Sequence, residues 1–255
     1  MSAGTGALTF ARFAYPPNAL GLCGPDASRE LLQRAAAGAA DAGLRELAAQ
    51  FEGAWPYLEL IAHENGIADP LDARVVEAYW IGNDLLDGIG PRAIGEDLAA
   101  RFGPAAGRER RRIAGLAGAA PRPHHDFHVF CVYPWTGLLR TGAGDRALHV
   151  LDRCRVRWGT VTAVAGPTAT VLGRPLVWDG RHLGLGAPRE EVVTVADGGD
   201  ALDPAIAAGD VVALHWDWAC TRLTPRQARA LRAETARQLA FVNRLAVPPP
   251  AAVLR

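Results

Sequence analysis

The chain has 255 residues, of which 49% are apolar and 21% charged, and its 27 basic residues balance its 27 acidic ones. This length predicts one large domain or two smaller ones. The zero net charge disfavours nucleic acid and anionic membranes as partners.

No part of the sequence is typical of a signal peptide or of a membrane span. Residues 1–10 lack a basic start and an apolar core, and no stretch of about 18 apolar residues is free of charge. The cysteines are scattered and form no Cys-x-x-Cys pair, so we expect a cytoplasmic protein with free thiols, each a potential soft metal ligand. They are Cys23, Cys131, Cys154 and Cys220.

The first half of the chain has a helical pattern. Between Asp26 and Phe102 apolar residues recur at intervals of three and four, for example at Leu31, Leu32 and Ala35. Asp69-Pro70 is typical of an N-cap followed by proline at the start of a helix. We therefore expect residues 1–146 to form a mostly α-helical domain.

The second half has a β pattern. After Cys154, short runs of β-branched and aromatic residues are separated by turns, and Asp179-Gly180 predicts a two-residue hairpin. Strands of this length and spacing are typical of a small barrel. Thr224 to Gln227 is a capping box that predicts a final helix. The expected fold class is α+β, with residues 147–255 forming a small OB-like β-barrel and a C-terminal helix.

Two motifs lie near the ends of this β region. The first is Cys154-Arg155-Val156-Arg157-Trp158-Gly159-Thr160-Val161, and the second is Gly209-Asp210-Val211-Val212-Ala213-Leu214-His215-Trp216, which precedes the capped helix. They resemble motifs of the HypC/HupF family of [NiFe]-hydrogenase assembly chaperones. That family has Cys-x-x-x-Pro-Gly-x-Val at its mature N-terminus, whereas here a tryptophan replaces the proline and the cysteine is internal.

The resemblance implies that Cys154 and His215 hold an iron fragment with carbon monoxide and cyanide ligands. It also implies two partners, a HypD-like scaffold protein and the hydrogenase large subunit. A thiolate is a soft donor suited to low-valent iron, and an imidazole can ligate or support it. We expect Cys154 to begin the first barrel strand and His215 to end the last one, with Arg153 and Arg155 lowering the pKa of the thiol.

A second group of metal-ligating side chains lies between Pro123 and Cys131. On a helix, His124, His128 and Cys131 would share a face, whereas on a strand His124, Asp126 and His128 would do so. Carboxylate and imidazole groups spaced four apart on a predicted helix could complete the site. This possible second metal site consists of His124, His125, His128, Cys131, Glu59 and His63. The structural alternative is that these histidines form hydrogen bonds between two domains, since the Glu-x-x-His pairs of di-iron bundles are missing.

These patterns favour a non-catalytic maturation factor that carries iron and whose helical domain recognises a partner or client. The alternative is an iron-dependent enzyme whose helical domain generates or modifies a small ligand for the metallocentre. A protein-interaction module that binds no metal is the third reading.

Overall fold

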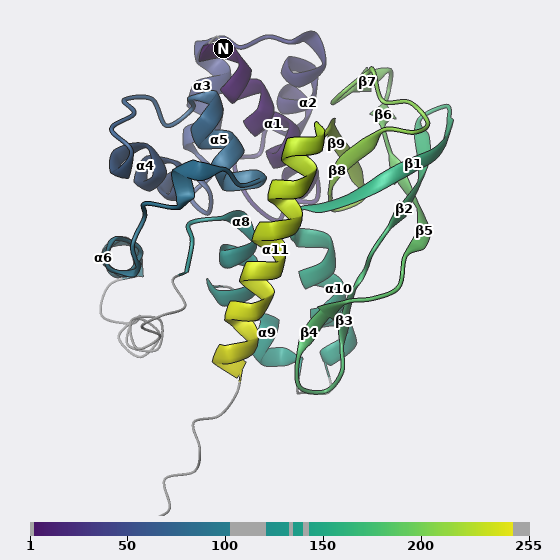
Figure 1. The fold of residues 1–255 in the computed structure, drawn as a ribbon. Helices are drawn as coiled ribbons and strands as arrows, with labels where there is room; N and C mark the ends of the chain where they lie inside the picture. Colours follow the sequence, from purple (N-terminus) through teal and green to yellow (C-terminus); the bar gives the residue numbers. More distant parts are fainter. Residues whose placement is uncertain (1–2, 103–120, 133–134, 140–142, 247–255) are drawn as a thin grey trace, which may run out of the picture.

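The computed structural model describes residues 3–102, 121–132, 135–139 and 143–246 (Figure 1). The architecture is α+β: helices come first, then a sheet region and one final helix. The first helices are α1 (Ala3–Ala19), α2 (Ser28–Ala37), α3 (Ala42–Ala49), α4 (Trp55–Glu64), α5 (Ala73–Trp80), the short η1 (Asp84–Leu86) and α6 (Pro91–Phe102).

Helix α1 is the centre of the helical region, although its sequence carries Pro16 and Pro17. It buries Phe10 and Phe13 completely and contacts α2, α3 and α5 as well as two strands of the sheet. The helical pattern predicted from Asp26 onward did not include α1, since prolines are typical of helix ends and turns. Both lie in its last turn, where each proline lacks the N–H that would bond to a carbonyl of the preceding turn.

The predicted cap at Asp69 is displaced by one turn. The Asp69 carboxylate accepts the Leu71 N–H at 2.9 Å, but α5 begins at Ala73 and is capped by Asp72, which accepts the Arg74 N–H at 2.8 Å.

A run of short helices connects the helical region to the sheet. It consists of α8 (His125–Phe127), a π-helical turn η3 (His128–Val132), α9 (Trp135–Leu138) and α10 (Gly144–Cys154). Helix α10 ends with Cys154, and the chain extends at Arg155 to enter the sheet. Cys154 therefore ends a helix, and the prediction that it begins the first strand is wrong by three residues.

The sheet region is built from short strands, mostly antiparallel. They are β1 (Arg157–Ala165), β2 (Thr168–Gly173), β3 (Leu176–Trp178), β4 (Leu183–Leu185), β5 (Arg189–Thr194), β6 (Ala196–Asp197), β7 (Asp200–Ala201), β8 (Val211–His215) and β9 (Trp218–Arg222).

Five of these strands pair in a closed ring, β1-β2-β5-β9-β8. Strand β1 pairs antiparallel with β8 from Arg157 opposite Leu214 onward, while β5 and β9 meet at one parallel pair. His215 ends β8 and not the last strand, because β9 follows it. The predicted hairpin exists as β3–β4, but its turn spans residues 179–182 instead of two residues.

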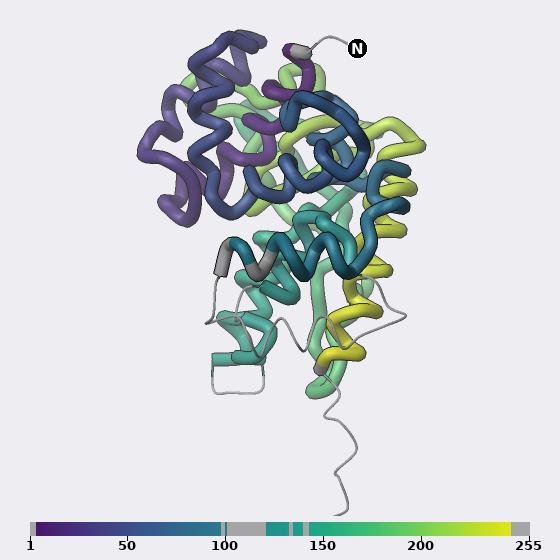
Figure 2. The backbone as a smooth tube through the Cα atoms, turned by 90° about the vertical axis from the view of Figure 1, so that its left-hand side faces the viewer, coloured from purple at the N-terminus to yellow at the C-terminus, as the bar shows by residue number. Residues whose placement is uncertain are grey.

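The final helix α11 (Pro225–Ala246) is capped as predicted. The Gln227 N–H donates to Thr224 Oγ1 and the Thr224 N–H donates to Gln227 Oε1, at 3.3 and 3.0 Å. This helix contacts α8 and η3 on one side and β4 on another, and Figures 1 and 2 both show it running beside the segment around α8.

One hydrophobic core includes residues from both halves, from Phe10 and Tyr79 to Leu231 and Phe241. This core thus spans the segments 1–146 and 147–255 that the sequence predicted as separate domains. Among the described residues, no helix is long and apolar enough to cross a lipid bilayer.

Candidate metal centre

Three side chains with metal-binding atoms meet where the helical region joins the sheet. One ligand atom each of His125, Cys154 and His215 lies within 4.8 Å of the other two. They come from the start of α8, the end of α10 and the end of β8. Residues from three distant parts of the sequence therefore form one cluster, which joins the predicted Cys154–His215 pair to a histidine of the predicted second site.

The end of α10 explains why these segments meet. The last carbonyls of a helix have no partner within the helix. Here the Arg153 carbonyl accepts the Trp216 N–H at 2.8 Å, and the Cys154 carbonyl accepts a hydrogen bond from His125 Nε2 at 2.8 Å. The carbonyls that α10 leaves free thus hold both the residue after His215 and the ring of His125.

The orientation of His215 depends on the proline pair in α1. Pro17 has no N–H to donate to the carbonyl four residues earlier, so the Phe13 carbonyl is left without its helical donor. His215 Nδ1 lies 2.6 Å from this oxygen and donates to it. The proton is thereby fixed on Nδ1, and Nε2 keeps the lone pair that a metal requires. Within the described residues this buried Nε2 has no hydrogen-bond partner.

In His125, unlike His215, both ring nitrogens form hydrogen bonds. Its Nε2 donates to the Cys154 carbonyl, so its Nδ1 accepts from the Tyr79 hydroxyl at 3.1 Å. The ring of Trp80 lies 4.5 Å from that of His125 and 5.5 Å from that of His215. A metal bound to His125 would have to replace one of its two hydrogen bonds.

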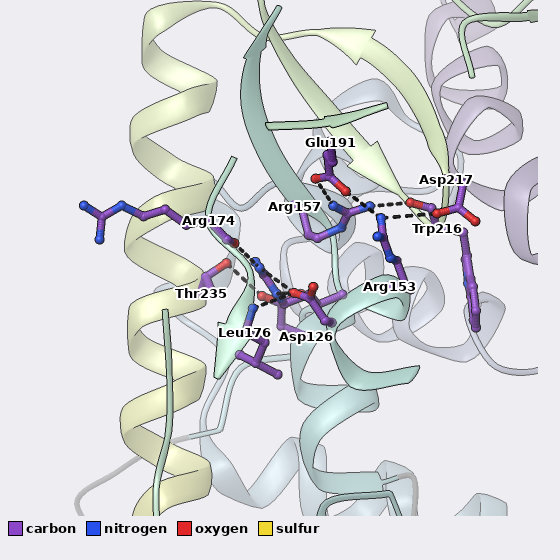
Figure 3. Close-up of polar contacts among 11 residues, drawn as sticks. Asp126, Arg153, Arg157, Arg174, Leu176, Glu191, Trp216, Asp217 and Thr235 are labelled. Carbon is purple, nitrogen blue, oxygen red and sulfur yellow. Dashed lines mark hydrogen bonds and ion pairs between the residues drawn. The ribbon is translucent and has the colours of Figure 1, made fainter. Parts of the chain in front are cut away.

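A partly buried ionic network fixes the backbone on both sides of the cluster (Figure 3). Arg153 and Arg157 point toward Glu191 of β5 and bind one carboxylate oxygen each, Arg153 at 2.6 Å. Arg157 also donates to the Trp216 carbonyl. Trp216 adopts a left-handed backbone conformation with φ 52°, which is strained for a residue other than glycine. The network thus holds a strained turn directly after His215.

Arg155 forms an ion pair of its own, with Asp152. It is 1% exposed and donates two hydrogen bonds to the Asp152 carboxylate, which also accepts the Leu176 N–H at 2.7 Å. Neither this arginine nor Arg153 lowers the pKa of Cys154 as the sequence suggested. Burial, followed by the nearby Cys23 thiol, raises it. Without a metal Cys154 is therefore a neutral thiol.

The histidines of the cluster are neutral as well. Burial lowers the pKa of His215 to about 4, against the opposing effects of the Phe13 carbonyl and the Cys154 backbone. Burial and the neighbouring His215 hold the pKa of His125 well below its usual range. Neutral imidazoles are the form that binds metal, so both rings are available near pH 7 without losing a proton.

The cluster lies at the wall of a cavity of about 310 Å³. Most of its lining is apolar, and its titratable or polar side chains include the three cluster residues, Cys23, Tyr79, His128 and Arg146. The volume greatly exceeds the approximately 30 Å³ that one water molecule occupies, and lies at the small end of ligand pockets. There is space for a metal that carries small ligands of its own.

The other predicted site residues are not part of the group of three metal-binding atoms, although the His128 ring lies 6.4 Å from that of His125. His124 is buried and caps α8 by accepting the Asp126 N–H at 3.0 Å, while Cys131 is in the core. His128 lines the cavity, with its Nδ1 3.4 Å from the Tyr57 hydroxyl. The predicted continuous helix through these three residues is not formed, because His124 has an extended backbone as the N-cap of α8 and a π-helical turn begins at His128.

Glu59 and His63 do not approach the cluster. Both side chains are exposed on α4, where Glu59 accepts from Trp55 Nε1 at 2.8 Å and His63 is 85% exposed. Within the described residues no carboxylate belongs to the group of metal-binding atoms. The carboxylate of Asp126 is buried, and it accepts a hydrogen bond from the Thr235 hydroxyl of α11 at 2.8 Å (Figure 3).

The chain belongs to a family of unknown function, DUF6390, whose model matches residues 2–248. No curated protein and no solved structure matches the chain significantly.

Proposed function

We propose that this protein carries a transition metal during metallocentre assembly. The cargo would be an iron fragment with carbon monoxide and cyanide ligands, destined for the large subunit of a [NiFe]-hydrogenase. The observation that carries the proposal is the cluster of Cys154, His215 and His125 beside a cavity. The identity of the cargo and of the partners, including a HypD-like scaffold protein, rests on the resemblance of the motifs at Cys154 and His215 to the HypC/HupF family.

The donor set fits iron in a low oxidation state. One thiolate and two neutral imidazoles are soft and borderline donors, whereas Mg²⁺ and Ca²⁺ prefer carboxylate and carbonyl oxygens. Binding would release the proton of the Cys154 thiol, since burial keeps that thiol neutral without a metal. Three protein donors leave at least one position for a ligand that arrives with the metal or from a partner, as open metal sites require.

The surroundings fit a loaded fragment better than a bare ion. The cavity has room for several diatomic ligands; its largely apolar wall suits neutral carbon monoxide, and Arg146 in its lining suits an anion such as cyanide. In this proposal the ring of five strands with α11 is the counterpart of the family's small OB-like barrel. The four free cysteines fit a reducing compartment such as the cytoplasm.

The role of the helical region follows from the same cluster. We expected a docking module or a separate metal site, but α8 supplies His125 to the site of Cys154 and His215. The iron-dependent enzyme stays as the second candidate, because the cavity beside the cluster would also admit a small substrate. It would use the same three donors, since Glu59 and His63 lie elsewhere.

The experiment begins with metal-free protein loaded anaerobically with ferrous iron and freed of excess metal. We expect one iron per chain, abolished by Cys154→Ser because serine keeps the shape but is a poor soft ligand. His215→Ala should weaken binding strongly, and His125→Ala less so because this ring has competing hydrogen bonds. Glu59→Gln and His63→Gln are the matched controls and should bind normally.

The cargo is tested in cells that produce a [NiFe]-hydrogenase together with this protein. Protein isolated from them should show infrared bands of metal-bound carbon monoxide and cyanide, and Cys154→Ser should lack them. Full hydrogenase activity with Cys154→Ser would refute the carrier. Iron without diatomic bands, together with turnover of a small substrate, would favour the enzyme.

A further inference from the structure

A second thiol shares the cavity of the cluster. Cys23 lines the same cavity as Cys154, His125 and His215, but it is not part of the group whose ligand atoms lie within 4.8 Å of one another. It is half-buried, and its neighbours Leu22 and Gly24 are exposed. Cys154 is half-buried as well, whereas His125 and His215 are buried, so Cys23 brings a second thiol to the cavity wall from an exposed loop.

The loop that carries Cys23 is held in place. Asn18, 6% exposed, donates from Nδ2 to the Cys23 carbonyl at 2.8 Å and to the Pro25 carbonyl at 2.6 Å. Gly24 has φ +79°, and a Cβ there would lie 2.3 Å from the ring of Phe51, which also lines the cavity. Only glycine fits this approach. The two hydrogen bonds from Asn18 and the close approach at Gly24 together keep the Cys23 thiol at the cavity wall.

The cavity also contains a donor with no partner. His215 is completely buried, and its Nε2 has no hydrogen-bond partner among the described residues. Because Nδ1 donates its proton to the Phe13 carbonyl, Nε2 is the nitrogen available to a metal. The half-buried thiol and this buried nitrogen give the cavity an outer and an inner metal-binding end.

We infer that Cys23 is a transfer ligand, the outer thiol that takes a thiophilic metal first and passes it to Cys154, His215 and His125. This inference rests on the proposed metal-carrier function. Both thiols line one cavity of about 310 Å³, so a metal in that cavity can be passed from one sulfur to the other without leaving it.

The transfer is a ligand exchange without oxidation or reduction. In the first step the Cys23 sulfur bonds to the metal, one bond from the metal to its donor breaks, and the Cys23 proton leaves to solvent. In the second step the Cys154 sulfur bonds to the metal, the bond to Cys23 breaks, and the Cys154 proton moves to the Cys23 sulfur. Release follows the same steps in reverse.

The first test asks whether the two thiols can be bridged in the full-length, metal-free protein. Dibromobimane becomes fluorescent when both of its arms have reacted with thiols. We expect bridging in the wild type and in Cys220→Ser, whose buried thiol is outside the cavity lining, but not in Cys23→Ser or Cys154→Ser. Lack of bridging in the wild type would overturn the inference.

The second test measures the rates of ferrous iron uptake and of its release to a chromogenic chelator. We expect Cys23→Ser to bind one iron per chain, because the three inner donors remain, but to load and release it at least about ten-fold more slowly than Cys220→Ser. Equal rates would overturn the transfer role and leave the proposed carrier intact. Loss of iron from folded Cys23→Ser would also overturn it, by making Cys23 a permanent ligand. If wild-type protein binds no iron, both proposals fail.

Discussion

The buried histidines predict that the metal-free protein loses stability between pH 7 and pH 5. Burial lowers the pKa of His124 and His215 to about 4 and that of His125 well below its usual range. In the unfolded chain each would titrate near pH 6.5. Below that pH the unfolded state binds three protons that the folded state does not, so the free energy of unfolding decreases as the pH falls.

Asp126 acts in the opposite direction. Burial raises its pKa to about 6, whereas an unfolded aspartate titrates near pH 4, so in this window the folded state holds one proton that the unfolded state lacks. The net difference near pH 5 is about two protons, or about 2.7 kcal/mol per pH unit. Integrated from pH 7 to pH 5, the expected loss is about 4 kcal/mol.

Urea unfolding at pH 7, 6 and 5 in the presence of a chelator measures this loss. His215→Gln should reduce it by roughly 2 kcal/mol, because one of the three histidines is removed. His63→Gln is the control, since this side chain is exposed, and should leave the pH dependence unchanged. Stability that is constant or that increases toward pH 5 would refute the buried, neutral state of the cluster.

Four further changes test how the site is held. Pro17→Ala supplies an N–H that competes with His215 for the Phe13 carbonyl, and iron titration should show an affinity loss of about 10- to 100-fold; unchanged affinity would contradict the role of the proline. Arg155→Met leaves the buried Asp152 carboxylate without its cation and should lower the free energy of unfolding by about 3–5 kcal/mol in urea; a wild-type value would contradict the pairing. Tyr79→Phe removes a hydrogen bond that His125 must lose on metal binding, so iron affinity should rise by up to about ten-fold; weaker binding would show that the hydroxyl supports the bound state. Residues 147–255 expressed alone should give poorly dispersed amide NMR signals, because α11 would lose its contacts with α8 and η3; a dispersed spectrum would show an independent domain.

Local patterns revealed much of the fold in advance. The spacing of Leu31, Leu32 and Ala35 predicted α2, and the capping box at Thr224 predicted the start of α11, because both signals depend on residues a few positions apart. Helix α1 was missed because Pro16 and Pro17 are locally unfavourable in a helix. The complete burial of Phe10 and Phe13 outweighs that cost, and burial depends on distant parts of the chain.

The site was predicted in part for the same reason. Motifs selected Cys154 and His215, but His125 was assigned to a separate site with Glu59 and His63. Its hydrogen bond to the Cys154 carbonyl depends on how α10 ends, which no local spacing reveals. In the sequence, only its thiol group indicated that Cys23 could be a metal ligand. Its place at the cavity depends on the hydrogen bond from Asn18 and on the contact of Gly24 with Phe51. Both are features of the tertiary structure.

The hydrogen bonds of the metal-free cluster bear on the difference between a carrier and a permanent metal site. His215 is preorganised, with Nδ1 fixed by Phe13 and Nε2 left without a partner in the described structure. His125 is satisfied without metal, since Tyr79 and the Cys154 carbonyl occupy both its nitrogens. Each net hydrogen bond is worth about 0.5–1.5 kcal/mol, so binding through His125 gains less than binding through a free imidazole. These bonds therefore stabilise the metal-free state and would lower the affinity for a third bond, which in the proposed carrier would favour release of the metal to a client.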